Sequence, residues 1–257
     1  MTITAPTLAE THVYPGKAIP NPMQTSALIH DNVTFGADAS IGDFCTIGVP
    51  PRGCDDGQLP TVFGKRARFR SHAVVYAGNV VGDDFVIGHS AYIRESNRIG
   101  DRVEIGAFNI WEGQVTVGDD VTFGAQTGIA EFSVIGSGVA IGPHVGLAAV
   151  SHPLSTNAKD SAQGPTIGDG VTIGAGVCVK PGLRIGAGAY LEPGAVVVKD
   201  VPPFTVVGGN SAKPLGDVWA LHPEAISRIS QYVDVSPAAV AAARRAFAEA
   251  ALPALAN

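Results

Sequence analysis

Apolar residues recur at every sixth position along most of this chain. The longest unbroken run consists of Phe63, Phe69, Val75, Val81, Ile87, Ile93, Ile99, Ile105, Trp111, Val117, Phe123, Ile129, Ile135, Ile141 and Leu147. Self-similarity at a fixed period is typical of repeat architectures. The pattern predicts short strands joined by sharp corners, with the apolar positions pointing into a common core.

The residue that follows each apolar position reveals a longer period. It is usually glycine, but at intervals of eighteen residues it is replaced, by Tyr76, Arg94, Glu112, Ala130 and Ala148. Three hexads therefore form one coil, and one of its three corners differs from the other two. Glycine suits a corner because it reaches positive φ without steric cost. We expect an all-β solenoid, a triangular parallel β-helix of about eight coils, each about 4.8 Å high.

Two interruptions and two flanking segments divide the chain. An extended lead-in is expected over 1–28 and the β-helix over 29–200, with loops at 48–62 and 148–166. Residues 201–257 form a lead-out followed by a short C-terminal helical segment, in which Ser236 is a suitable N-cap and Pro237 a suitable first helical residue.

Composition excludes several classes of protein. The net charge of −6 argues against a nucleic-acid or anionic-membrane surface. No apolar run approaches the roughly 18 residues of a membrane span, and the N-terminal residues lack the pattern of a secretory signal. The three cysteines are scattered, which predicts neither a disulfide framework nor a CxxC metal site. We therefore expect a cytoplasmic protein.

Charged side chains gather at the corner that lacks glycine. Stacking places Arg94 and Glu112 one coil apart, where they can pair across adjacent coils, with Glu95 and Glu131 in the neighbouring row. Exposed ion pairs contribute little to stability. Both insertions depart from this corner, however, and Glu131 lies one coil before the second. The sequence makes Glu131 a candidate catalytic residue and Glu95 a candidate substrate contact.

Histidines supply the other candidates. His152 stands at the root of the 148–166 insertion and is followed by Pro153, and an imidazole can accept a proton near neutral pH. Gln126 and His144 are eighteen residues apart, which places them next to each other on one side of the prism as possible substrate contacts. His89 is a further candidate for contacting an acceptor.

The repeats as a whole resemble the hexapeptide-repeat acyltransferases, whose fold is a left-handed parallel β-helix that assembles as a trimer. The segment containing IGPHVGLAAVSHPLS and continuing to Leu215 is similar to maltose and galactoside O-acetyltransferases. The earlier segment FRSHAVVYAGNVVGDDFVIGHSAYIRESNRIG is more similar to acyltransferases that act on nucleotide-linked amino sugars.

This resemblance implies a mechanism. His152 is expected to be the general base that deprotonates an acceptor hydroxyl or amine as it attacks the thioester of acyl-CoA, the co-substrate. A backbone N–H at Gly174 or Ala175 would stabilise the oxyanion. Basic side chains near the C-terminal coils would contact the CoA phosphates, namely Lys180, Arg184, Lys199 and Lys213. Gln126 maps close to a position where the family has an acceptor-contacting Asn.

The sequence thus predicts a homotrimeric acyltransferase with sites between subunits and no metal. The acyl group is expected to be acetyl, and the acceptor a sugar, sugar nucleotide or related small molecule. One alternative is a zinc enzyme similar to the γ-class carbonic anhydrases, although the chain lacks their pair of histidines five residues apart. The other is a non-catalytic β-helix that serves as an assembly module.

Overall fold

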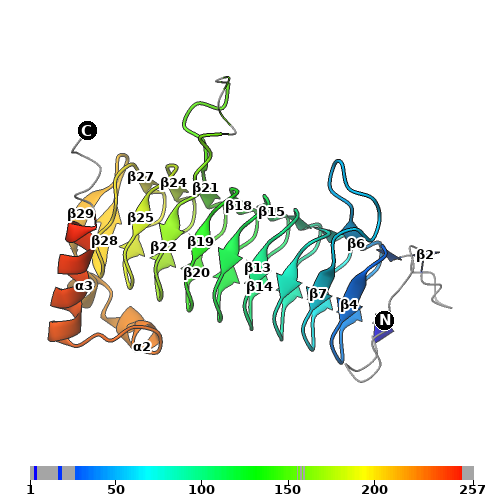
Figure 1. The fold of residues 1–257 in the computed structure, drawn as a ribbon. Helices are drawn as coiled ribbons and strands as arrows, with labels where there is room; N and C mark the ends of the chain where they lie inside the picture. The colour runs from blue at the N-terminus through cyan, green and yellow to red at the C-terminus, as the bar shows by residue number, and fades with distance from the viewer. Residues whose placement is uncertain are drawn as a thin grey trace.

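The computed structural model describes residues 3–4, 17–18, 27–154, 156, 158 and 160–250. Most of the predicted lead-in, and the last residues of the chain, lie outside this part. Within it the chain winds into a three-sided prism, and each side is one β-sheet whose strands run across the long axis (Figure 1). No helix in these residues is long and apolar enough to cross a bilayer.

The three sheets, which we name A, B and C, take successive strands of the chain in turn. Sheet A contains, in spatial order, β1 (Ile3–Thr4), β5 (Ser40–Ile41), β8 (Arg68–Phe69), β11 (Val86–Ile87), β14 (Glu104–Ile105), β17 (Thr122–Phe123), β20 (Ala140–Ile141), β23 (Thr172–Ile173), β26 (Tyr190–Leu191), β28 (Thr205–Gly208) and β29 (Lys213–Asp217). Sheet B contains β2 (Lys17–Ala18), β3 (Leu28–Ile29), β6 (Thr46–Val49), β9 (Val74–Tyr76), β12 (Tyr92–Ile93), β15 (Ile110–Trp111), β18 (Gly128–Ile129), β21 (Gly146–Leu147), β24 (Cys178–Val179) and β27 (Val196–Val197). Sheet C contains β4 (Val33–Phe35), β7 (Thr61–Phe63), β10 (Val80–Val81), β13 (Arg98–Ile99), β16 (Thr116–Val117), β19 (Val134–Ile135), β22 (Thr166–Ile167) and β25 (Arg184–Ile185).

The register follows the eighteen-residue period. Val81 lies opposite Ile99, and Ile99 lies opposite Val117, all in parallel strands. The sixth-position side chains fill the interior: Trp111 and Phe123, for example, are at most 1% exposed. The predicted parallel β-solenoid is confirmed.

The prism is slightly longer than predicted. In the described part of the chain the sheets contain 11, 8 and 10 strands, so the longest side has about ten layers rather than eight. One added layer is β28, which pairs in parallel with β26 although it follows the proline-rich start of the lead-out. At the other end β1 and β2 pair antiparallel with β5 and β3.

Glycine occupies the corners for a different reason from the one predicted. In the regular coils the positive φ angles fall two residues later, on residues such as Asp84 (57°) and Arg102 (55°), and Gly82 and Gly100, which directly follow strands, do not have one. Instead, a Cβ on Gly82 would lie 2.8 Å from the carbonyl carbon of Gly100 in the next coil. The close approach of stacked coils therefore requires glycine here.

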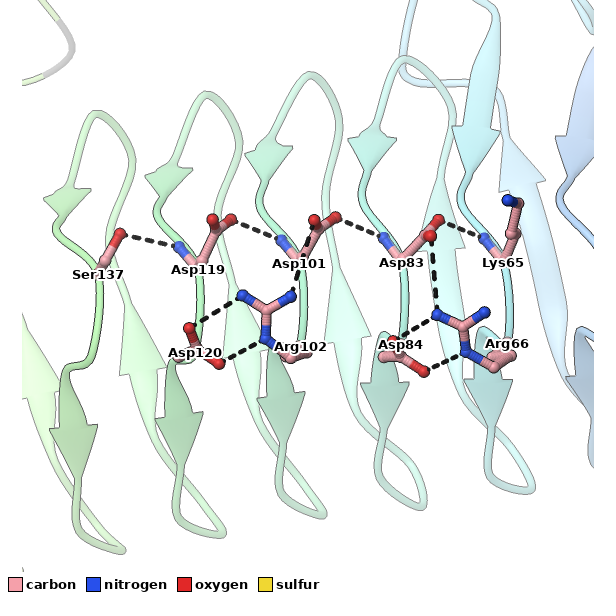
Figure 2. A network of polar contacts seen from close by, with 9 residues as sticks. All are labelled: Lys65, Arg66, Asp83, Asp84, Asp101, Arg102, Asp119, Asp120 and Ser137. Atoms are coloured by element: carbon pink, nitrogen blue, oxygen red, sulfur yellow. Dashed lines mark hydrogen bonds and ion pairs between the residues drawn. The ribbon is translucent and has the colours of Figure 1, made fainter. Parts of the chain in front are cut away.

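A row of polar contacts follows the corner between sheets C and A (Figure 2). The Oδ1 atom of each aspartate accepts the backbone N–H of the preceding coil, at 2.8 Å for both Asp101 and Asp119. Beside this row, Arg102 pairs with Asp120 at 2.6 Å, and Arg66 pairs with Asp84 at the same distance. Side-chain oxygens thus satisfy corner N–H groups that the sheets do not.

The C-terminal segment covers one end of sheet A. It comprises α1 (Val218–Leu221), η1 (Pro223–Ala225), α2 (Ile226–Ile229) and α3 (Pro237–Glu249), which lie beside β28 and β29 (Figure 1). As predicted, Ser236 caps α3: its hydroxyl accepts the N–H of Ala239. A small apolar core forms here, made of Phe204, Val206, Val218, Ile229 and Val240.

Candidate functional site at the histidine loop

The second insertion projects from the corner between sheets B and C, the same corner from which residues 50–60 project at the other end of the prism (Figure 1). Its root is closed by a hydrogen bond of 2.8 Å from the N–H of Gln163 to the carbonyl of Ala149. Gly182, in the next coil, donates in turn to the carbonyl of Gln163. We name the residues from 150 to 162 the histidine loop. His152 lies at its start and is exposed.

A hollow of about 390 Å³ lies at the root of the histidine loop. Two acidic residues that follow strands of sheet B, Glu112 and Glu131, line it together with Pro153. The backbone N–H of Glu131 lies 3.4 Å from Oε2 of Glu112, and the other walls are apolar. The structure thus places two carboxylates beside the residue that follows His152.

A second hollow of about 190 Å³ continues from the first along the outer surface of sheet B. The two share Glu112, Ala130 and Leu147. Its floor is formed by Gly128 and Gly146, which lie opposite each other in β18 and β21. A Cβ on either glycine would meet no atom within 4 Å. These glycines are not needed for packing within the chain, and their effect is to leave a groove.

Four predicted site residues lie at the opposite edge of sheet B, at the corner with sheet A. Gln126 and His144 stack there in successive coils, both with positive φ and both exposed. Gly174 and Ala175 follow β23 at the same corner. The N–H of Gly174 donates to the carbonyl of Leu191 at 2.8 Å and is used in stacking the coils. Within one chain, these residues and the histidine loop are separated by the width of sheet B.

Arg94 pairs with Glu95 rather than with Glu112. Arg94 Nη2 lies 2.6 Å from Oε1 of Glu95, its neighbour in the chain, and this hydrogen bond raises the pKa of Arg94. Stacking brings the Cα atoms of successive coils together, but the corner turns the two adjacent side chains towards each other. The Glu95 carboxylate is therefore paired with Arg94, and Glu95 lies two coils away from Glu131.

The basic candidates differ in their surroundings. Lys180, Lys199 and Lys213 are exposed on the last coils. Arg184 is held more firmly: its Nη2 lies 2.8 Å from Oδ2 of Asp200, and its guanidinium carbon lies 4.3 Å from the ring centre of Phe247 in α3. The position of Arg184 favours a role in fastening the C-terminal helix to the prism.

His89 lies far from the histidine loop. Its Nδ1 is 2.8 Å from the hydroxyl of Ser71, in a different hollow near the N-terminal coils. The residues at the groove on sheet B that the sequence did not single out are Gly128 and Gly146. Their signal is visible in the sequence, because the position before the buried residue is glycine in these two strands and Tyr92 or Ile110 in the two before them.

Among the described residues, no group of three His, Cys, Asp or Glu side chains is arranged to hold a metal ion.

Comparison with known proteins gives local similarity. The family model described as "Bacterial transferase hexapeptide (six repeats)" matches residues 164–199. A Schizosaccharomyces pombe protein described as an acetyltransferase is 45% identical over 77 residues, which cover 28% of this chain and 37% of that protein. Mitochondrial serine acetyltransferase 3 of Arabidopsis thaliana is 58% identical over 52 residues, which cover 20% of this chain and 13% of that protein.

Among solved structures, a maltose O-acetyltransferase of Clostridium difficile 630 is 26% identical and superposes with a TM-score of 0.38, covering 46% of this chain and 67% of that one. The chain thus spans about a third or less of the length of the two sequence relatives, and the structural match is partial. The predicted resemblance to hexapeptide-repeat acyltransferases is confirmed.

Proposed function

We propose that this chain, which resembles hexapeptide-repeat acetyltransferases, transfers an acyl group from acyl-CoA to a small acceptor at the histidine loop. The observation that carries the proposal is the hollow at the root of this loop, bordered by Glu112, Glu131 and Pro153 and continuous with the groove over Gly128 and Gly146. The hollow suits a polar acceptor, and the groove suits a slender chain such as the pantetheine arm.

His152 is the proposed general base. Its imidazole takes the proton of the acceptor hydroxyl or amine while that group attacks the thioester carbonyl. Charge then develops on the carbonyl oxygen and needs a positioned N–H donor. We assign this donor to Ala175, because the N–H of Gly174 is bonded to Leu191. Glu131 is proposed to stabilise the imidazolium or an ammonium group on the acceptor.

His152 and Ala175 lie at opposite edges of sheet B, so the proposed mechanism requires a second copy of the chain. The loop of one copy would face the corner of the next that carries Gln126, His144 and Ala175. Phe108 and Ile110, on the Ala175 side of sheet B, are 57% and 59% exposed, and exposed apolar residues of this size favour an interface. We propose a homotrimer, with Lys180, Lys199 and Lys213 near the phosphates of CoA.

The acceptor is proposed to carry a hydroxyl or amine on a sugar, a sugar nucleotide or a related metabolite. The identity with serine acetyltransferase 3 over 52 residues adds hydroxyl amino acids to this range. Two carboxylates in the hollow suit an acceptor with an ammonium group, which amino sugars and amino acids share.

The test is a thiol-release assay with acetyl-CoA and a panel of sugars, amino sugars, sugar nucleotides and hydroxyl amino acids. With the best acceptor, His152→Ala should lower kcat by about 10²- to 10⁴-fold without changing the melting temperature. His72→Gln, at a corner remote from the loop, is the matched control. An active His152→Ala enzyme would exclude the base role, and a fully active monomer in light scattering would exclude the shared site.

A further inference from the structure

A separate hollow of about 300 Å³ lies near the N-terminal end of the prism, at the corner between sheets A and B. The polar residues that line it are Ser40, Asp43, Arg68, Arg70, Ser71 and His89. Between His89, which follows β11, and Ala175, which follows β23, sheet A advances by four strands. At about 4.8 Å per strand this is roughly 19 Å, so the hollow is distinct from the proposed acyl-transfer site.

The hollow exists because one corner breaks the local pattern. Ile41, Phe69 and Ile87 lie opposite one another in register, and the residues that follow them are Gly42, Arg70 and Gly88. Arg70 therefore replaces the glycine that both neighbouring coils carry. Neither glycine has a side chain, and Arg70 is exposed and lines the hollow together with Arg68, which is also exposed.

These two arginines differ from others at the corners of the prism. Arg66 and Arg102 each pair with an aspartate one coil away, at 2.6 Å. In the described part of the chain, by contrast, no carboxylate lies within ion-pair distance of Arg68 or Arg70. A guanidinium has five N–H donors in a fixed fork and no acceptor, a geometry that matches carboxylate and phosphate oxygens.

Ser71 and His89 together add a hydrogen-bond donor to this hollow. When the Ser71 hydroxyl donates to Nδ1 of His89, at 2.8 Å, the ring proton is on Nε2 and can be donated to a ligand. Asp43 is the one carboxylate of the lining, which also contains two guanidinium groups, and Arg68 acts electrostatically on Asp84 outside the lining. This balance favours a ligand with one anionic group over a polyanion.

We propose that this hollow is a binding site for a single oxyanion group, phosphate or carboxylate, on a small ligand, and that His89 serves this site. Arg68 and Arg70 bind the anion, and Nε2–H of His89, whose ring is oriented by Ser71, completes its hydrogen bonds. The proposal does not depend on the acyl-transfer function, because it concerns other coils and is read out by binding alone.

The test is calorimetric titration of the full chain with inorganic phosphate and, separately, with acetate, at constant ionic strength set with chloride. Arg70→Gly restores the glycine of the neighbouring coils and should fold normally, yet it should weaken binding at least about tenfold. Arg98→Gln, which removes an exposed arginine from sheet C, is the matched control and should bind like the parent protein.

The site would be supported by saturable binding that is weakened in Arg70→Gly and unchanged in Arg98→Gln. The anion that binds more tightly would identify the preferred group. Absence of saturable binding of both anions would overturn the proposal. Equal weakening by both variants would also overturn it, because it would show only the general effect of removing a positive charge.

Discussion

Nε2 of His222 lies 2.8 Å from Oε1 of Glu192, and the same ring stacks on Tyr190 with the centroids 3.7 Å apart. Nδ1 of His222 is 3.2 Å from Glu224. Burial by itself would lower the pKa of His222, but the hydrogen bonds to Glu192 and Glu224 outweigh it, and the pKa is raised. This imidazole thus joins the C-terminal segment to the last coils through a bond that depends on its charge.

Docking of the C-terminal segment should therefore depend on pH. Because the folded pKa is raised, the contribution of His222 is complete below its unfolded pKa of about 6.5 and is lost as the pH rises through the folded value. Relative to His222→Gln, the parent protein should melt higher at pH 6, by about 2–4 °C, and this difference should shrink by pH 8. A difference that stays constant or grows with pH would contradict the assignment. Glu192, Glu224 and Tyr190 contact His222, and Arg228 acts on Tyr190, so the parent protein and His222→Gln must be compared at each pH.

The aspartate row in Figure 2 should contribute to stability through its acceptor atoms rather than its charge. Asp101 accepts the N–H of Asp83 through Oδ1 at 2.8 Å. Asp101→Asn keeps an oxygen acceptor, whereas Asp101→Ala leaves that N–H without its partner. We expect Asp101→Ala to lower the melting temperature by about 2–4 °C and Asp101→Asn to lower it by clearly less. Equal losses in thermal unfolding would show that the charge matters instead.

Side chains added in the groove on sheet B should leave the fold intact but should weaken substrate binding. A Cβ on Gly146 meets nothing within 4 Å, and valine is favoured in strands, so Gly146→Val should fold with an unchanged or higher melting temperature. It should raise the KM for acyl-CoA or the acceptor by at least about tenfold. Thr116→Val, on the outer surface of sheet C, is the control. An unchanged KM in Gly146→Val would show that the groove is not used.

The six-residue pattern was sufficient to predict the prism. In a β-solenoid the same local packing recurs in every coil, and each apolar position contributes one buried side chain to it. The pattern could not show why glycine follows the strands. Positive φ and close approach of neighbouring coils both select glycine, and only the contact between Gly82 and Gly100 distinguishes them.

The surroundings of the histidine loop were predicted in part, whereas the roles of the site residues stay predictions. Counting hexads placed Glu131 beside the histidine loop, and the hollow agrees with that position. Counting could not give the direction of the side chains, so it could not show that Arg94 pairs with Glu95 and not with Glu112. Nor could it show that Arg70, one exception in a row of glycines, would leave a hollow around itself.

Because each regular coil has eighteen residues, the prism grows by the same length with every coil. Each coil contacts only its neighbours, so removing one whole coil, for example residues 99–116, would leave every remaining strand with an equivalent partner. The distance between the Arg70 hollow and the histidine loop is thus adjustable in steps of about 4.8 Å, one strand spacing at a time. Gain or loss of whole coils could bring two sites on such a protein closer together or move them apart without redesigning either.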